Sequence, residues 1–268
     1  MKIESKSRIK TFLSRYGEDY LFVLPFLLVF CAFTVVPVLI SMILSLTEFD
    51  VLQPPAFNGL SNYIRLFMDD SLFPIALKNT LFISLITGPV GFLLSLILAW
   101  LLNELGNRVR ACMTLLFYAP AISGGAYMIW QIIYSGDSYG FLNGILMYWG
   151  IIYEPKQWLT DSSVMMISAI FLILWMSFGA GFLSFIAGFK NVDKSLYEAG
   201  AIDGIKNRFQ EMWLITLPSM RPQLMFSAVM SITSSFGMGD IISAVFGFPS
   251  TNYTLYTMVQ LLQDYGNI

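Results

Sequence analysis

The sequence predicts an all-α, polytopic membrane protein with five membrane-spanning helices and a cytoplasmic N-terminus. The first reason is composition: 56% of the 268 residues are hydrophobic and only 12% are charged, whereas roughly a quarter of a globular domain is charged. The second is a set of charge-free windows, and the third is the uneven placement of basic residues. Buried core helices of a soluble protein are the alternative explanation of the windows.

Five windows without a charged residue approach or exceed the roughly 18–20 apolar residues that cross a bilayer. They cover residues 21–46, 79–102, 111–136, 162–189 and 222–239. Lipid offers no partners to backbone amides and carbonyls, so each window is expected to be a helix.

Basic residues set the orientation. A cytoplasmic N-terminus leaves only Arg65, Lys78 and Lys156 of the 15 Lys and Arg residues outside, as the positive-inside rule requires. The cytoplasmic set is Lys2, Lys6, Arg8, Lys10, Arg15, Arg108, Arg110, Lys190, Lys194, Lys206, Arg208 and Arg221.

The first window is too long for the apolar part of a signal peptide, and no small-residue cleavage site follows it, so we expect it to remain as an anchor. Before it, Ile9, Phe12, Leu13 and Tyr16 recur at helical spacing among basic residues. Residues 1–20 are therefore predicted to be a cytoplasmic segment at the membrane surface, and a frayed basic tail is the alternative. Residues 21–268 are expected to form one transmembrane domain.

The connections alternate between the two sides. Residues 47–78 and 137–161 are expected outside, the second with a short surface helix, and "NELGNRVRAC" joins the second and third windows inside. Ser123-Gly124-Gly125 and Asn143-Gly144 are read as bends. Residues 241–263 contain Pro, Asn and several Thr, which favours an external capping segment; a sixth span is the alternative.

Several classes of function lack their residues. The chain has no His, which removes Ser-His-Asp and Cys-His catalysis and nitrogen-rich zinc sites. No GxxxxGK[ST] loop that would bind ATP is present. Cys31 and Cys112 fall in positions that cannot form a disulfide framework, and no basic cluster interleaved with aromatics indicates nucleic-acid binding. No enzyme activity, metal site or cofactor is expected in this chain.

One short motif is similar to the active-site pattern of a class of enzymes. "GMGD", Gly237 to Asp240, matches the short Gly-x-Gly-Asp pattern of intramembrane aspartyl proteases. Such enzymes need two carboxylates that share a proton, and no window contains a second Asp or Glu. A chance match explains this four-residue motif, which contains two glycines, better than a protease site does.

Residues 190–221 hold nine charged residues between two apolar windows, and they divide into two short helices. Asp193 is placed to cap the first helix, and Gly204 to end it in the left-handed conformation. The second helix, "NRFQEMWLITL", carries Phe209, Trp213 and Leu217 on one face and is expected to stop before Pro218. Arg221-Pro222 then opens the last window. The first helix is small and smooth at Ala199, Gly200 and Ala201 beside the charge of Glu198, which suits docking; a solvated loop is the alternative.

These segments resemble a known family. "EAGAIDG" followed by "ITLP" looks like the Glu-Ala-Ala motif of permease subunits of binding-protein-dependent ATP-binding-cassette importers. "FNGLSNYIRLF", "ALKNTLFIS" and "APAISGGAYMIWQIIY" extend the match, which covers the chain from about residue 20. They are similar to the carbohydrate branch, which contains the maltose and glycerol-3-phosphate permeases.

The chain departs from the family pattern in three places. Gly200 stands at the second Ala, which keeps the surface small. Ten residues, 205–214, separate Gly204 from Ile215 where the pattern has nine, and we expect the extra residue to lengthen the bend between the helices, leaving the register of the second helix open. The family has a further, sixth span after a loop like 246–265, so the last span is expected to be missing here.

The resemblance implies a subunit of a bacterial plasma-membrane sugar importer that works by alternating access, and an oligosaccharide is the substrate that the family leads us to expect. The implied partners are a second permease, two cytoplasmic ATPase subunits that bind MgATP, and an extracellular sugar-binding protein. The residues implied to couple the chain to an ATPase are Glu198, Ala199, Gly200, Asp203, Gly204, Ile215, Leu217 and Pro218. A membrane scaffold without transport activity is the alternative, and an exporter a third reading.

Sugars are bound by aromatic faces and hydrogen-bonding side chains, which makes five residues candidates for the substrate path. They are Tyr127, Trp130, Gln131, Trp175 and Ser177. A place in the interfacial aromatic belt is the alternative for Tyr127 and Trp130. Ser177, Gly181, Ser184 and Gly188, spaced by three or four residues, are interpreted as a stripe for close helix packing.

Overall fold

The computed structural model describes residues 19–49 and 53–266, and it divides into two compact units, Met1–Asp70 and Ser71–Ile268. The all-α fold predicted from the sequence is confirmed, apart from one short hairpin. The surface helix expected within residues 1–20 lies almost entirely outside the described residues and stays a prediction. So does the division of the chain at residue 20.

The first unit is built on one apolar helix. It runs over Asp19–Leu44, with a π-helical turn η1 (Cys31–Val35) leading into α2 (Val36–Leu44). Strands β1 (Thr47–Glu48) and β2 (Ala56–Phe57) pair antiparallel, and α3 (Ser61–Ile64) and η2 (Arg65–Asp69) follow. The N–H of Val36 bonds to the carbonyl of Cys31, five residues back. This wider turn lets the helix continue through Pro37, whose ring would otherwise press on the preceding turn.

The second unit is helical throughout its described part. Its longer helices are α4 (Leu72–Asn103), α5 (Asn107–Ile122), α8 (Ser162–Met176), α9 (Ala180–Asn191) and α13 (Arg221–Phe236). The shorter helices are η3 (Ala126–Met128), α6 (Ile129–Ile133), α7 (Phe141–Tyr148), α10 (Lys194–Ile202), α11 (Arg208–Glu211), η4 (Met212–Thr216), α12 (Leu217–Ser219), α14 (Gly239–Phe246), η5 (Thr251–Tyr253) and α15 (Met258–Gly266).

The predicted number of spans fits these helices. Asp19–Leu44 and Leu72–Asn103 are each long and apolar enough to cross a membrane. Three bent pairs reach that length together: α5 with η3 and α6 at 88°, α8 with α9 at 42°, and α13 with α14 at 44°. If each pair is one span, the total is five. The sharpest bend lies at Ser123-Gly124-Gly125, where the sequence predicted one.

The second span begins earlier than predicted. Helix α4 starts at Leu72 and includes Lys78, whereas the charge-free window starts at residue 79. The side chain of Lys78 is exposed. A charged residue at the end of a span can reach toward water without interrupting the helix, so the limit of a charge-free window is not the limit of the helix.

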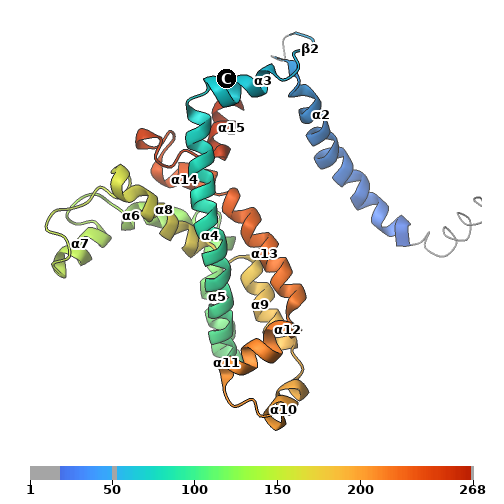
Figure 1. The fold of residues 1–268 in the computed structure, drawn as a ribbon. Coiled ribbons are helices and arrows are strands. Elements are labelled where there is room, and N and C mark those ends of the chain that lie inside the picture. Colours follow the sequence, from blue (N-terminus) through green and yellow to red (C-terminus); the bar gives the residue numbers. More distant parts are fainter. Residues whose placement is uncertain (1–18, 50–52, 267–268) are drawn as a thin grey trace, which may run out of the picture. The chain divides into compact units, whose positions relative to one another are not determined.

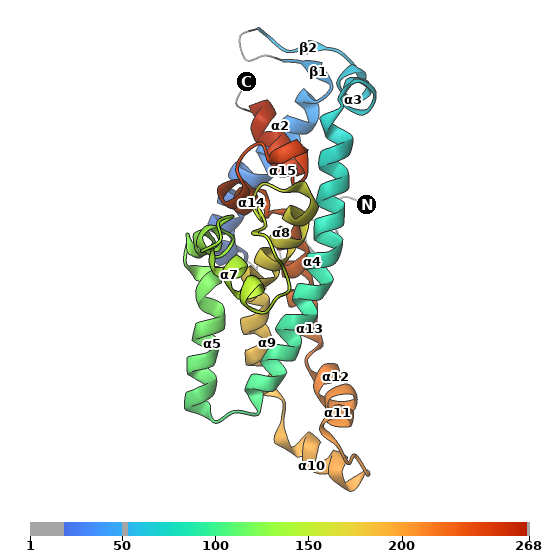
Figure 2. The ribbon, with the colours of Figure 1, turned by 90° about the vertical axis from the view of Figure 1, so that its left-hand side faces the viewer.

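Helices α4, α9 and α13 form the packed centre of this unit, side by side in both views (Figures 1 and 2). Glycines allow the close approach. A Cβ on Gly181 would lie 3.3 Å from Cβ of Ser227, and one on Gly188 would lie 2.6 Å from Cε of Met220. The packing role predicted for these two members of the small-residue stripe is confirmed, whereas Ser177 lies in the break between α8 and α9.

The C-terminal segment packs beside the N-terminal half of α4, at the opposite end of that helix from α10 and α11 (Figure 1). Nδ2 of Asn79 donates to the carbonyls of Tyr253 and Tyr256, both at 3.0 Å, and the N–H of Met258 donates to Oγ1 of Thr80 at 2.8 Å. Residues 241–263 form three short helices in place of one span, which fits the predicted capping segment and not the sixth span.

Candidate functional site

The first short helix of the charged loop has the two ends that the sequence predicts. The side chain of Asp193 accepts a hydrogen bond from the N–H of Ser195 at 3.0 Å and caps the start of α10. This backbone hydrogen bond is the main reason why the pKa of the Asp193 carboxyl is lowered. Gly204 follows the helix with φ 92°, and the N–H of Ile205 bonds to the carbonyl of Gly200 at 2.9 Å. That pattern is the left-handed helix end in which glycine is favoured.

The second helix continues past the predicted end. It runs from Arg208 through the π-helical turn η4 to Ser219, so Pro218 lies inside it and does not stop it. The N–H of Leu217 bonds to the carbonyl of Met212, five residues back, and Pro218 follows at once. In both helices a π-turn comes directly before a residue followed by proline: η1 before Val36-Pro37 and η4 before Leu217-Pro218. The wider turn leaves space for the proline ring.

The π-turn overlaps the end of the ten-residue spacing that follows Gly204. A π-turn holds one more residue than an α-turn while the helix on either side keeps its facing. The π-turn is one place that could hold the extra residue, and the prediction that this residue lengthens the bend between the helices stays a prediction.

The buried face of the second helix is not the face that carries its apolar repeat. Phe209 and Trp213 are 63% and 62% exposed, whereas Met212, Thr216 and Met220 are buried. An apolar repeat cannot by itself distinguish a side chain that packs in the protein from one that faces lipid or another chain. The sequence pattern identified the helix but did not show which of its faces is buried.

The two short helices pack through Gly200. This glycine is buried, and a Cβ on it would lie 2.6 Å from Cδ1 of Ile215 and 3.0 Å from Cδ1 of Ile205. The hydroxyls of Tyr197 and Thr216 add a hydrogen bond of 2.9 Å between the same helices. Gly200 therefore faces the second helix and is not part of the exposed surface on which the sequence placed it.

The other predicted coupling residues divide between these two surroundings. Ile215 and Leu217 are half-buried, and Ile215 reaches Gly200. The exposed members are Glu198, Ala199, Asp203, Gly204 and Pro218. The structure thus leaves an exposed surface on α10 and its end, supported from behind by the second helix.

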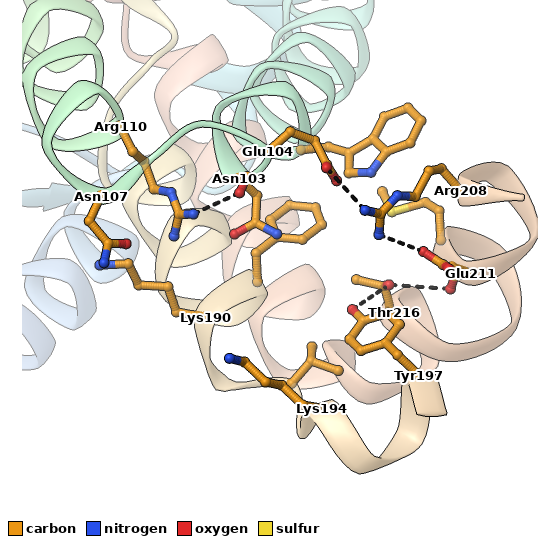
Figure 3. A pocket seen from close by; sticks show the side chains of 14 residues that line it. Asn103, Glu104, Asn107, Arg110, Lys190, Lys194, Tyr197, Arg208, Glu211 and Thr216 are labelled. Carbon is orange, nitrogen blue, oxygen red and sulfur yellow. Dashed lines mark hydrogen bonds and ion pairs between the residues drawn. The ribbon is translucent and has the colours of Figure 1, made fainter. Parts of the chain in front are cut away.

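An open cleft of about 580 Å³ lies between this loop and the ends of α4, α5 and α9 (Figure 3). On one wall Arg208 bridges two carboxylates, Glu211 at 2.9 Å and Glu104 of the α4 end at 3.4 Å. The hydrogen bond that Arg208 donates to Glu211 is the main reason why the pKa of Arg208 is raised. The side chain of Arg208 is 68% exposed, so this bridge orients the loop more than it stabilises the fold.

Four of the five candidate path residues lie together. Tyr127, Trp130 and Gln131 follow the 88° bend, and the ring of Trp130 meets that of Trp175 on α8 edge to face at 5.7 Å. Nε2 of Gln131 donates to the carbonyl of Ala244 at 2.8 Å. Among the described residues, the buried Nε1 of Trp130 has no hydrogen-bond partner.

Ser177 lies apart from that cluster, in a second and smaller cavity enclosed by α4, the α8–α9 break and α13. Hydroxyl groups dominate its polar lining, which comes from Ser95, Ser177, Ser227, Ser231 and Ser234. Oγ of Ser227 and Oγ of Ser231 donate to the carbonyls of Gly181 and Gly88 at 2.9 and 2.7 Å. The α13 serines were not among the residues predicted from the sequence, although polar residues at i, i+4 and i+7 in an apolar span were a signal.

Asp240 has a partner other than the one a protease requires. Its carboxylate accepts a hydrogen bond from Nε2 of Gln263, an amide of α15. Within the described residues no cluster of three His, Cys, Asp or Glu that could hold a metal ion was found. The Gly237–Asp240 motif gains no support as an aspartyl protease site.

These features define a class of protein, a polytopic helical membrane protein with a packed bundle, a small cavity lined in part by serine hydroxyls, and two short helices in one loop. Residues 91–267 match the model of the family described as binding-protein-dependent transport system inner membrane component. The chain belongs to this family, and it is a transmembrane subunit of such a system.

Individual relatives agree with the family assignment. The chain is 34% identical to the probable ABC transporter permease protein YesP of Bacillus subtilis, over 89% of this chain and 77% of the relative. It is 31% identical to the lactose transport system permease protein LacF of Rhizobium radiobacter, over 92% and 80%. A bacterial alginate ABC transporter, crystallised with an alginate pentasaccharide-bound periplasmic protein, shares the fold at a TM-score of 0.74 and 21% identity, over 97% and 88% of the chains.

Proposed function

We propose that this chain is the transmembrane subunit of an ATP-driven importer of an oligosaccharide and forms half of the translocation path. The relative named for lactose transport and the fold shared with an alginate transporter support this class of substrate. The observation that carries the proposal is the hydroxyl-lined cavity inside the α4, α9 and α13 bundle. The oxygens of these hydroxyls can accept hydrogen bonds from a sugar without the cost of burying a charge.

The substrate path runs past this cavity and the aromatic cluster near α6. Ser177 is two residues from Trp175, whose ring contacts Trp130, so the break between α8 and α9 joins the polar cavity to an aromatic surface. Discontinuous helices of this kind line substrate sites in transporters. The cavity measures only about 80 Å³, so a sugar can pass only after the helices around it separate.

The exposed part of α10 is the docking surface for an ATPase subunit. Glu198, Ala199 and Asp203 face outward there, and Gly200 is packed on Ile215, so a push on α10 is transmitted to the second helix and on to α13. A second permease, two ATPase subunits that bind MgATP and an extracellular sugar-binding protein complete the system. ATP shifts the permease between its states only if the docked ATPase contacts them differently.

Two substitutions test the coupling surface. Glu198→Lys reverses a charge on it, and Gly204→Trp places a large side chain at a φ that only glycine adopts readily. Either change is expected to abolish sugar uptake while membrane insertion stays normal. Lys156→Glu, an exposed charge reversal outside this loop, is the matched control. Transport that persists with both variants would rule out the coupling role.

Co-purification distinguishes the importer from a membrane scaffold without transport activity. The importer subunit brings down an ATPase and a second permease in stoichiometric amounts, and a scaffold does not.

A further inference from the structure

A groove on the bundle shares no lining residue with the cavity at Ser177. It has a volume of about 320 Å³ and lies between α5 and α9. Apolar atoms from Ala111, Leu115, Leu183 and Ile186 form most of its wall. Both helices belong to membrane-spanning segments, so the groove lies at the depth of lipid acyl chains.

Two cations stand at the cytoplasmic end of the groove. Arg110 and Lys190 line both the groove and the cleft beside the charged loop, so the two spaces meet at these residues. Arg110 is fixed in place because its guanidinium donates to the carbonyls of Leu102, Asn103 and Leu105 at 3.2, 2.7 and 3.0 Å. Lys190 is exposed, and among the described residues it has no ion-pair partner.

The charge around this meeting point is positive. Lys194 lines the same side of the cleft as Arg110 and Lys190 in Figure 3. The carboxylates of the cleft, Glu104 and Glu211, lie on the other wall, and both are paired with Arg208. An anion at the mouth of the groove therefore meets cations without a competing carboxylate.

A buried hydroxyl inside the groove needs a partner. Oγ1 of Thr114, which lines the groove, is buried and has no hydrogen-bond partner in the described part of the chain. Thr114 lies four residues beyond Arg110 on α5, which is about 6 Å deeper along the helix axis. A buried hydroxyl without a partner is unfavourable, and the ester carbonyl of a lipid would lie at about this depth below its phosphate.

We propose that the groove between α5 and α9 binds an anionic phospholipid of the cytoplasmic leaflet. Its phosphate lies between Lys190 and Arg110, and the hydroxyl of Thr114 donates to an ester carbonyl. One acyl chain lies along Ala111, Leu115 and Leu183. Basic pockets between membrane helices on the cytoplasmic side are suited to such head groups.

The test uses the intact transport complex in nanodiscs that contain equal amounts of phosphatidylglycerol and phosphatidylcholine. Native mass spectrometry counts the lipids retained after release. The wild-type complex retains phosphatidylglycerol preferentially, and Lys190→Ala lowers this retention about fivefold, which corresponds to the ~1 kcal/mol of one lysine near an anionic surface. Lys78→Ala, which removes an exposed lysine at the other end of the bundle, leaves the retention unchanged.

Two further variants separate the groove from the charge. Ala111→Trp fills the groove and removes the retained lipid although both cations remain, whereas Cys112→Trp, next to it but outside the groove lining, does not. The nearly isosteric Thr114→Val lowers retention several-fold without changing the packing. Wild-type retention by both Lys190→Ala and Ala111→Trp would overturn the proposal. A cross-link from Leu115→Cys to a companion permease would also overturn it, because protein would then fill the groove.

Discussion

Gly200 of α10 and Ile215 of the following helix approach so closely that the glycine has no space for a side chain in its present surroundings. A Cβ on Gly200 would lie 2.6 Å from Cδ1 of Ile215, and the neighbouring Cδ1 of Ile205 would be 3.0 Å away. Both neighbouring atoms are the ends of flexible side chains. The contact joins the surface proposed to receive the ATPase to the helix that leads into α13.

This contact predicts how substitutions at Gly200 rank. Gly200→Ala is expected to keep uptake, because Cδ1 of Ile215 can rotate away and alanine gains about 0.5–1 kcal/mol in a helix. Gly200→Leu overpacks the interface at a cost of about 1–3 kcal/mol, separates the helices and reduces uptake strongly. Combining it with Ile215→Ala should restore part of the loss. Uptake and thermal stability of the purified complex measure both effects, and a Gly200→Leu variant with normal uptake would contradict the prediction.

The Asp193 cap predicts a pH effect on α10. The folded-state pKa of this carboxyl is lowered, so its contribution to helix stability is present above the ordinary pKa of about 4 and is lost as the pH falls through the lowered value. The protection factors of the Ser195 and Leu196 amides, which correct for the intrinsic pH dependence of exchange, should therefore fall in acid. Asp193→Asn, whose amide oxygen still accepts, should remove the pH dependence of the protection, whereas Asp193→Ala should give low protection at every pH. Equal exchange in all three proteins would show that the cap does not hold the helix end.

A larger side chain at Gly91 is expected to disturb the serine-lined cavity and so to reduce uptake. A Cβ there would lie 2.9 Å from Cβ of Ser177, so Gly91→Leu is expected to drive α4 away from the α8–α9 break or to fill the cavity. Uptake should fall at least tenfold, while binding of the ATPase subunits persists. Val90→Leu, on an exposed site of the same helix, is the control and should transport normally. Normal uptake by Gly91→Leu would place the path elsewhere.

Local chemistry decided which features the sequence could predict. Asp193, Gly204 and the bend at Ser123-Gly124-Gly125 each act through their own backbone, so residue type was enough. The number of spans followed from the charge-free windows, since the energy of a charge in lipid depends little on which helices are neighbours.

Features that depend on partners across the structure were predicted less well. Phe209 and Trp213 carry the apolar repeat of the second helix but are exposed. The residues of this helix that are buried are Met212, Thr216 and Met220. The serines of α13 line a cavity because α4 and α9 pack around them, and the sequence alone does not show that packing. The sequence placed Gly200 on the surface, but Ile215, fifteen positions later in the chain, packs against it.

The π-turn η4 leads to a prediction about deleting one residue, Leu214. If η4 holds the residue that makes the Gly204–Ile215 spacing ten instead of nine, removing the exposed Leu214 should turn it into a regular α-turn. Met212 and Thr216 would then lie three residues apart and still share a face, so insertion and part of the uptake should survive. Deleting Thr216 instead removes a buried hydroxyl that bonds to Tyr197 at 2.9 Å and should abolish uptake. Uptake assays on both deletions decide the matter: if the Leu214 deletion is as inactive as the Thr216 deletion, the wide turn is required to accommodate Pro218 and is not simply the place of an extra residue.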